Sequence, residues 1–214
     1  MFRKETDTRD EFYEYSFNYL TRKRRILFLR GVISSYPGGY SGRNDPHSPT
    51  VLSDDIIALN LEDPEKPIYI IIDSPGGEVS TGMTLYDTMK LSKAPIYTLG
   101  QNCASMATII LAAGDTKLIF PHGKLMLHLP STNIQGDTKE VEIKTKEILK
   151  VKDDLVQCYI DNGVTAGLDE ATPNKIHKQI LKDIDREFWL NAEEAISYGL
   201  ADRIITKEDL FGKD

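Results

Sequence analysis

The sequence is poor in the features that would assign it to a specialised class of protein. It has only two cysteines, Cys103 and Cys158, so it implies no disulfide framework and favours a reducing compartment. The longest apolar stretch, residues 106–113, is far too short to cross a bilayer. The N-terminus is charged and lacks the apolar segment of a signal peptide. Together these features predict a cytoplasmic protein that does not span a membrane.

An excess of positive charge is also lacking. Lys and Arg number 26 against 33 Asp and Glu, a formal net charge of -7, whereas nucleic-acid binders need surplus basic residues to neutralise phosphates. The one basic run, residues 22–25, directly precedes the apolar residues 26–29, and we interpret it as the solvated start of a strand. The length of 214 residues allows one sizeable domain with a real core. We therefore expect no nucleic-acid partner.

Apolar, β-rich segments alternate with helical segments along the chain. The predicted strands are residues 25–31, 67–73, 95–99, 117–120 and 124–128. The predicted helices are residues 54–61 (capped by Ser53), 79–91, 106–113, 138–161, one that starts at Thr172-Pro173, and one that is capped by Asn191 and ends at Gly199. This alternation predicts an α/β layer fold with a largely parallel sheet.

The helix predicted at residues 138–161 is long and charged. Two oppositely charged pairs at i,i+4 support it, Glu140–Lys144 and Glu142–Lys146. It has no obvious strand partner, so we expect it to project from the core or to pack on another subunit.

Ser105 is a candidate nucleophile because of where it lies. Serine hydrolysis needs an activated hydroxyl, a base within hydrogen-bond reach and donors for the oxyanion. Ser105 stands at the start of the apolar helix 106–113, where the helix dipole is positive and the N–H of Met106 can point at a developing oxyanion. The alternative is that Ser105 merely caps this helix, and these residues by themselves favour the cap. Cys103 is a rival nucleophile without that helix-start geometry.

Two further segments carry the other groups that this chemistry requires. Gly76 and Gly77 follow a buried strand, where paired glycines let a substrate backbone approach and expose backbone N–H groups; the alternative is an ordinary turn. His128 ends the strand 124–128 and is a candidate base, although a satisfied core or surface histidine is the commoner interpretation. The remaining histidines have no ligand-like spacing with cysteines or acids, so we assign no metal.

In combination and in order, short segments of the chain resemble the Clp protease (ClpP) family. The matching segments are residues 63–66, 70–77, 86–89, 104–106, 111–114, 125–128, 135–136, 147–149, 192–195 and 198–200, within about residues 25–205. The resemblance implies a ClpP/crotonase-like α/β fold, a repeated β-β-α superhelix with a protruding helical handle. The implied organisation is an N-terminal arm or axial segment (1–24), a peptidase domain (25–206) with its handle at about 131–161, and a C-terminal tail (207–214).

The resemblance also implies the activity of a serine endopeptidase in ATP-dependent proteolysis. Ser105 would attack the peptide carbonyl, and His128 would take the proton of Ser105. The N–H groups of Gly77 and Met106 would form the oxyanion hole. Substrate would bind as an added β-strand. The residues implied to bind it are Gly76, Glu78, Val79, Thr132, Asn133 and Ile134.

The third member of the catalytic triad is where the sequence departs from the family pattern. Ungapped alignment puts Glu187 where the family has an Asp, and a carboxylate one methylene longer can still orient an imidazole. Asp185 is the fallback, and a surface salt-bridge network around Arg186 is the alternative. In addition, Gly100 stands five residues before Ser105, where the family has a glycine four residues before. These departures indicate a divergent paralogue.

By the same resemblance, the chain is expected to form two stacked seven-membered rings, with helix 138–161 in the ring-to-ring contacts. A hexameric Clp ATPase unfoldase would deliver polypeptide substrates and use the ATP, so the chain itself is expected to need no cofactor. Glu187 and Gly100 motivate an alternative, a non-catalytic or regulatory Clp subunit that assembles with an active paralogue. A more distant alternative is a crotonase-type acyl-CoA enzyme, in which His128 would have no role.

Overall fold

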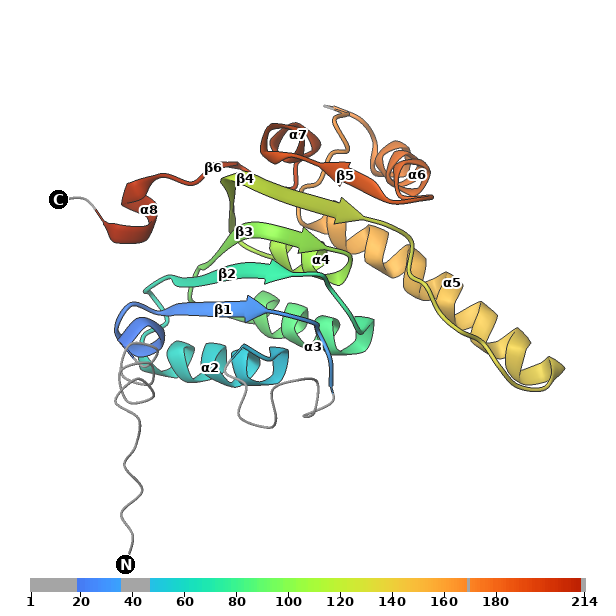
Figure 1. The fold of residues 1–214 in the computed structure, drawn as a ribbon, viewed down its shortest axis with the longest axis horizontal. Helices are drawn as coiled ribbons and strands as arrows, with labels where there is room; N and C mark the ends of the chain where they lie inside the picture. Colours follow the sequence, from blue (N-terminus) through green and yellow to red (C-terminus); the bar gives the residue numbers. More distant parts are fainter. Residues whose placement is uncertain (1–18, 36–46, 169, 213–214) are drawn as a thin grey trace, which may run out of the picture.

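The structure is a computed structural model that describes residues 19–35, 47–168 and 170–212 (Figure 1). Residues 1–18 of the predicted arm and residues 36–46 lie outside the described residues. The elements in chain order are η1 (Tyr19–Lys23), β1 (Ile26–Arg30), α2 (Pro49–Glu62), β2 (Ile68–Ser74), α3 (Val79–Lys90), β3 (Ile96–Ala104), α4 (Met106–Ala112), β4 (Thr116–Leu127), α5 (Thr138–Asp161), α6 (Pro173–Asp183), β5 (Phe188–Leu190), α7 (Ala192–Tyr198), β6 (Arg203–Ile204) and α8 (Lys207–Phe211).

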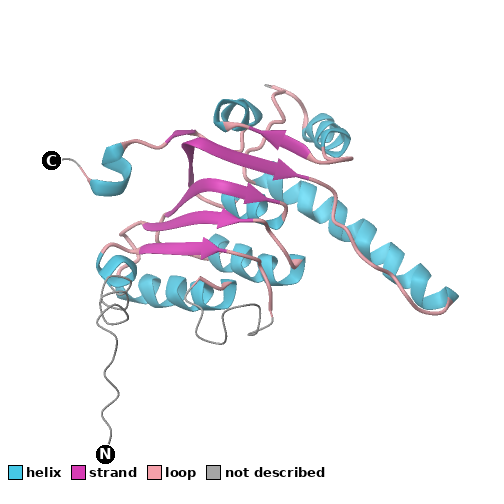
Figure 2. Ribbon diagram, in the orientation of Figure 1, coloured by secondary structure: helices cyan, strands magenta, loops and turns pink. Residues whose placement is uncertain are grey.

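The strands form one mixed sheet in which parallel pairs predominate (Figure 2). β1, β2, β3 and β4 lie in sequence order and pair in parallel, β5 pairs antiparallel with β4, and β6 pairs in parallel with β4. Helices connect the parallel strands, as crossover connections require. The predicted α/β fold with a largely parallel sheet is confirmed.

The two faces of the sheet are covered unequally. Alternate residues of a strand point to opposite faces, so Leu27 and Leu29 join a large core that includes buried residues of α2, α3, α4 and α7. Ile26 and Ile71 instead belong to a small cluster on the other face, and the partly buried residues around it come from η1, the strands and α8. The helices therefore cover one face of the sheet with a large core, whereas the other face carries only a small apolar cluster.

The helix α5 projects from the sheet over the first part of its length, and the segment that precedes it runs alongside (Figure 1). Asp137 and Glu140 form a capping box at its start, which fixes the predicted beginning of the helix. Its buried residues, Val156, Cys158 and Tyr159, lie in the last turns. The exposed part is a handle of charged residues, and the buried part packs against the core.

Only one of the two ion pairs predicted in α5 is present. Lys146 Nζ lies 2.6 Å from Glu142 Oε1, which confirms that pair. The prediction for Glu140 and Lys144 is wrong, because Lys144 donates to the Gln135 carbonyl at 2.8 Å while Glu140 accepts from the Asp137 N–H. The capping box occupies the glutamate that the pair would have used.

The start of α2 also differs from the prediction. Pro49 occupies the first turn and Ser48 is the N-cap, whose side chain accepts from Val51 N–H. Proline is favoured there because its fixed φ suits a helix and its missing N–H would have been unpaired. Ser53, predicted as the cap, is buried inside the helix and donates to the Pro49 carbonyl at 2.9 Å.

β4 is a single strand of 12 residues where two strands were predicted. Its register against β3 shifts between the pairs Gly100–Ile119 and Asn102–Lys124, so the Pro-His-Gly segment at 121–123 forms an irregularity inside one strand. β3 has a shift of its own, because β2 advances from Ile72 to Ser74 while β3 advances from Gly100 to Cys103. β3 thus contains one extra residue, relative to β2, shortly before Ser105.

Candidate active site

Ser105 lies in a tight connection between β3 and α4. Its backbone has φ 55° and ψ −126°, a conformation that costs a non-glycine residue of the order of 1–3 kcal/mol. The Ser105 N–H donates to the Met126 carbonyl at 2.7 Å, and the Ser105 carbonyl accepts from Thr108 N–H at 2.9 Å. The Ser105 side chain makes no capping bond to α4, so the interpretation of Ser105 as a simple N-cap is wrong.

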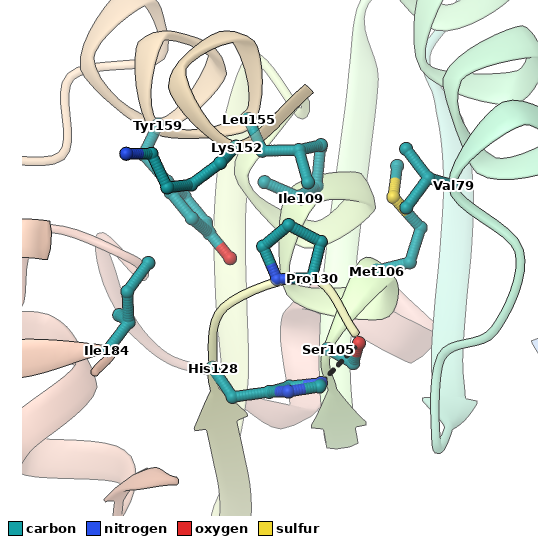
Figure 3. Close-up of a pocket in the computed structure, with 10 residues that line it drawn as sticks. All are labelled: Val79, Ser105, Met106, Ile109, His128, Pro130, Lys152, Leu155, Tyr159 and Ile184. Carbon is teal, nitrogen blue, oxygen red and sulfur yellow. Dashed lines mark hydrogen bonds between the residues drawn. The ribbon is translucent and has the colours of Figure 1, made fainter. Parts of the chain in front are cut away.

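His128 directly follows the end of β4, and its ring reaches Ser105 (Figure 3). Nε2 of His128 lies 2.8 Å from Ser105 Oγ, and both residues are half-buried. β3 and β4 are neighbours in the sheet, which is how two residues 23 positions apart meet at the same edge. A hydroxyl and an imidazole at this separation can exchange a proton.

The Gly76-Gly77 turn lies against Ser105. Gly76 has φ 86°, and a Cβ added there would stand 2.5 Å from the Ala104 carbonyl oxygen, 2.8 Å from Ser105 Cβ and 2.9 Å from Met106 N. Only glycine fits both the dihedral and the space. In the described part of the chain, neither Gly77 N–H nor Met106 N–H donates to a protein acceptor. The two N–H groups are therefore free to bind an anion.

A pocket opens beside Ser105 and His128 (Figure 3). Most of its lining is apolar, and the lining residues other than this pair are Val79, Met106, Ile109, Pro130, Lys152, Leu155, Tyr159 and Ile184. The residues come from α3, α4, α5 and the loops after β4 and α6. The arrangement can hold an apolar side chain next to the hydroxyl.

Two segments adjoin the candidate catalytic residues: residues 132–134 follow His128 in the chain, and the turn at Gly76 contacts Ser105. Residues 132–134 have no regular secondary structure, and in the described residues their backbones make no hydrogen bond with other backbone groups. The Gly76 turn is bonded to Ile33, whose N–H donates to the Gly76 carbonyl at 2.9 Å and whose carbonyl accepts from the Glu78 N–H at 2.8 Å. The carboxylate of Glu78 accepts from Ser35 N–H at 2.8 Å, and hydrogen bonds from Ser35 lower the pKa of Glu78. Glu78 thus anchors the neighbouring loop.

Neither acid predicted for the triad bonds to the His128 ring. β4 and β5 pair antiparallel with Leu127 opposite Phe188, so the register continued by one residue sets Glu187 opposite His128. The Glu187 carboxylate instead accepts from the indole N–H of Trp189 at 3.0 Å. Asp185 Oδ2 lies 3.6 Å from Arg186. Among the described residues, the one hydrogen-bond partner of the His128 ring is Ser105.

Cys103 does not fit the role of a nucleophile. Its side chain is 1% exposed and its thiol donates to the Ile72 carbonyl at 3.5 Å. Burial raises the pKa of the Cys103 thiol, so it stays protonated and unreactive. Two residues that the sequence did not single out, Thr108 and Tyr159, do contact the nucleophile region through hydroxyl groups.

Neither a metal-binding cluster nor a membrane-spanning helix occurs within the described ranges. No group of three or more His, Cys, Asp or Glu side chains is arranged to hold a metal ion in that part of the chain. No described helix combines the length and the apolar character that a membrane span requires.

A known protein family matches most of the chain. A model of the Clp protease family matches residues 40–208, which is more than half of the chain. The matched stretch contains the Gly76-Gly77 turn, Ser105, His128 and Glu187. The family expected from the sequence segments is confirmed.

Proposed function

Because this chain belongs to the Clp protease family, we propose that it is a serine endopeptidase with Ser105 as nucleophile and His128 as general base. The observation that carries the proposal is the 2.8 Å separation of Ser105 Oγ and His128 Nε2. The strained backbone of Ser105 supports it, since such conformations concentrate at active sites.

The reaction would proceed in two steps. Ser105 Oγ forms a bond to the peptide carbonyl carbon as its proton passes to His128 Nε2, and the carbonyl oxygen becomes an oxyanion bound by Gly77 and Met106 N–H. His128 then gives the proton to the leaving amine nitrogen as the C–N bond breaks, which leaves an acyl ester on Ser105. A water molecule attacks the ester, His128 takes its proton, and the proton returns to Ser105 Oγ as the acid product leaves.

The substrate would bind as an added strand between residues 132–134 and the Gly76 turn. The free backbone groups of Thr132, Asn133 and Ile134 suit main-chain hydrogen bonds to a peptide. On the opposite side the contacts would come from Gly76, Glu78 and Val79, of which Gly76 and Glu78 already use their backbone groups to bond Ser74, Ile33 and Gly82. The adjoining apolar pocket would accept the side chain that precedes the cleaved bond.

Glu187 is the stronger candidate for the third triad member. The β4–β5 register sets its backbone opposite His128, whereas Asp185 lies two residues further along an exposed turn. A rotation that exchanges the Trp189 indole for the His128 ring would complete the triad. Asp185 remains the fallback if that exchange does not occur.

The chain would act inside an assembly, which keeps an unselective peptidase away from other proteins. We propose two stacked heptameric rings, with the domain at 25–206, the handle at about 131–161 between the rings, and arm and tail at either end. Exposed apolar residues on α5, namely Val141, Ile143 and Leu149, support a contact role for the handle. A hexameric Clp ATPase would supply unfolded polypeptide and use the ATP, and this chain would need no cofactor.

A second candidate is a non-catalytic subunit that assembles with an active paralogue. The bond between Glu187 and Trp189, which leaves His128 without an acid, is the observation that favours it. No observation favours an acyl-CoA enzyme, because that activity would give the Ser105–His128 pair no function.

The deciding experiment treats the purified assembly with a fluorophosphonate and, separately, with a fluorogenic peptide. We expect label on Ser105 by mass spectrometry and hydrolysis that Ser105→Ala abolishes. Ser197→Ala, at an exposed serine on α7, is the matched control and should keep both signals. An assembly that takes no label and cleaves no peptide, with or without an unfoldase, would contradict the enzyme and favour the non-catalytic subunit.

A further inference from the structure

A chain of two buried hydroxyl groups runs from the handle helix to the backbone of Ser105. We propose that Thr108 and Tyr159 are positioning residues, which hold the Ser105 carbonyl and thereby the conformation that presents Oγ to His128. The inference rests on the proposed peptidase function and adds two residues to its machinery. Neither hydroxyl contacts the reacting atoms, so each acts through the backbone of Ser105.

The distances define a continuous connection. Thr108 Oγ1 donates to the Ser105 carbonyl at 2.6 Å, and the same Oγ1 lies 2.6 Å from the Tyr159 hydroxyl. Thr108 is 0% exposed and Tyr159 is 5% exposed. The bond between the two hydroxyls is buried, where the low dielectric strengthens it, and the bond to the Ser105 carbonyl is partly buried.

The direction of the hydrogen bonds follows from counting protons. A hydroxyl has one hydrogen to donate, and Thr108 gives its hydrogen to the Ser105 carbonyl. Tyr159 must therefore donate to Thr108 Oγ1. Burial raises the pKa of the Tyr159 phenol, so the phenol keeps its proton throughout the neutral range. Both hydrogen bonds therefore donate in the same direction, from the Tyr159 phenol to Thr108 Oγ1 and from Thr108 Oγ1 to the Ser105 carbonyl.

Ser105 needs such support because its backbone is strained. A residue with φ 55° and ψ −126° persists only where its surroundings hold it from several sides. The Met126 carbonyl fixes the N–H side, and Thr108 fixes the carbonyl side through both its N–H and its hydroxyl. Loss of the hydroxyl would leave one bond on the carbonyl side and would let the Ser105 peptide relax.

A merely local role for Thr108 would look different. Thr88, on α3, has a hydroxyl that donates to the Thr84 carbonyl at 2.8 Å, but it is exposed and bonds within its own helix. Thr108 instead bonds the strained residue and is itself bonded from a residue 51 positions away. Thr88 thus provides a matched control for the removal of a helical threonine hydroxyl.

The test compares single-atom changes in the assembled protein. Thr108→Val removes the hydroxyl at constant shape, Thr108→Ser keeps it, and Tyr159→Phe removes only the phenol oxygen and leaves the pocket wall. The controls are Thr88→Val and Tyr86→Phe, because the Tyr86 hydroxyl accepts from Asn162 at 2.8 Å outside the site. Readouts are kcat and KM for a fluorogenic peptide, the rate of fluorophosphonate labelling, and the thermal midpoint.

We expect Thr108→Val to lower kcat and the labelling rate about tenfold with KM unchanged, which corresponds to the loss of one buried hydrogen bond. Tyr159→Phe should lower both about threefold, because Thr108 keeps its bond to Ser105 but loses its polarising donor. Thr108→Ser and both controls should stay within about twofold of the wild type.

Three results would overturn the inference while the peptidase itself stands. They are full activity of Thr108→Val in an active wild-type background, a change confined to KM, and an equal loss in Thr108→Ser. If Thr108→Val does not fold, Tyr159→Phe decides the question by the same criteria. An inactive wild type that takes no label contradicts the proposed function first, and so is distinguishable from a failure of the positioning role.

Discussion

The segment around Ser105 and the turn at residues 185–187 lie on either side of His128, and they are built very differently. Every residue of α4 is buried, and Ser105 is bonded at its N–H, its carbonyl and its hydroxyl. Asp185, Arg186 and Glu187 are all exposed, and their side chains bond only to residues one or two positions away. The proposed nucleophile and base are preorganised by the core, whereas the candidate acids are held only by local contacts.

The difference has a physical cause. Side chains on an exposed turn are stabilised by little more than surface hydrogen bonds, which contribute about 0.5–1.5 kcal/mol each, so they can exchange partners. The backbone of a residue between a central strand and a buried helix has no such freedom, since any movement disturbs the packing. The acid can therefore join or leave the site while Ser105 and His128 stay in place.

The largest effect is expected from Ser105→Gly, in the buried segment between β3 and α4. Peptide hydrolysis should fall by a factor on the order of 10⁴ or more, because the nucleophile is lost. Glycine adopts the φ of 55° without strain, so the free energy of unfolding should rise by about 1 kcal/mol. Urea unfolding of Ser105→Gly and Ser105→Ala, compared side by side, checks this; a less stable glycine variant would show that the backbone is not strained.

The next effect is expected from Gly76→Ala. The new Cβ would stand 2.5 Å from the Ala104 carbonyl oxygen at a φ of 86°, so the turn must move away from Ser105. We expect a loss of about 100-fold or more in kcat/KM and about 1–3 kcal/mol of stability. Gly31→Ala also has a positive φ of 73° but meets no atom within 4 Å, so it controls for strain without the clash. Equal activity losses in the two variants would contradict a positional role for Gly76.

A moderate effect is expected from Glu187→Gln, on the exposed turn at residues 185–187. If Glu187 moves to orient His128, kcat should fall about 10- to 100-fold, less than for a buried triad acid because water screens an exposed carboxylate. Asp185→Asn is the control and should stay within about twofold. The reverse ranking would make Asp185 the triad member, and no loss in either variant would show that the pair works without an acid.

The smallest effect is expected from Trp189→Phe. This change removes the indole N–H that binds Glu187 at 3.0 Å and so frees the carboxylate for His128. Activity should rise about two- to threefold, in keeping with the small net free energy of one exposed hydrogen bond. The measurement is kcat with the fluorogenic peptide, and the gain should vanish in the double variant with Glu187→Gln. A gain that survives in the double variant would assign the effect to another cause.

Elements with local signals were predicted well from the sequence. The helix at 138–161 has the expected bounds, and α7 has the expected cap at Asn191 and left-handed end at Gly199, because capping depends on residues a few positions apart. The Pro-His-Gly segment looks like a turn and so predicts two strands, and only its pairing with β3 shows that β4 is one continuous strand. Ser53 has the residue type of a cap, and the sequence alone does not show that α2 begins earlier, at Pro49.

As with the fold, the parts of the candidate site that have local sequence signals could be predicted. Ser105, His128 and the glycine turn lie in recognisable segments, and the parallel strands bring them together. The contact between Thr108 and Tyr159 joins residues 51 positions apart with no local signal, so it depends on how α5 packs on α4. The sequence does not show the hydrogen-bond partner of Glu187 either, because that partner depends on one side-chain rotation on an exposed turn.

Because β3 contains one extra residue between Gly100 and Cys103, the number of residues in this segment matters as much as their identity. Ile96 and Cys103 both face the large core, although seven positions separate them and strict alternation would turn them to opposite sides. The extra residue is what lets Cys103 face the same core as Ile96, so we expect deletion of one residue at Gln101 to turn Cys103 toward the opposite face. A substitution at Gln101 leaves this spacing intact.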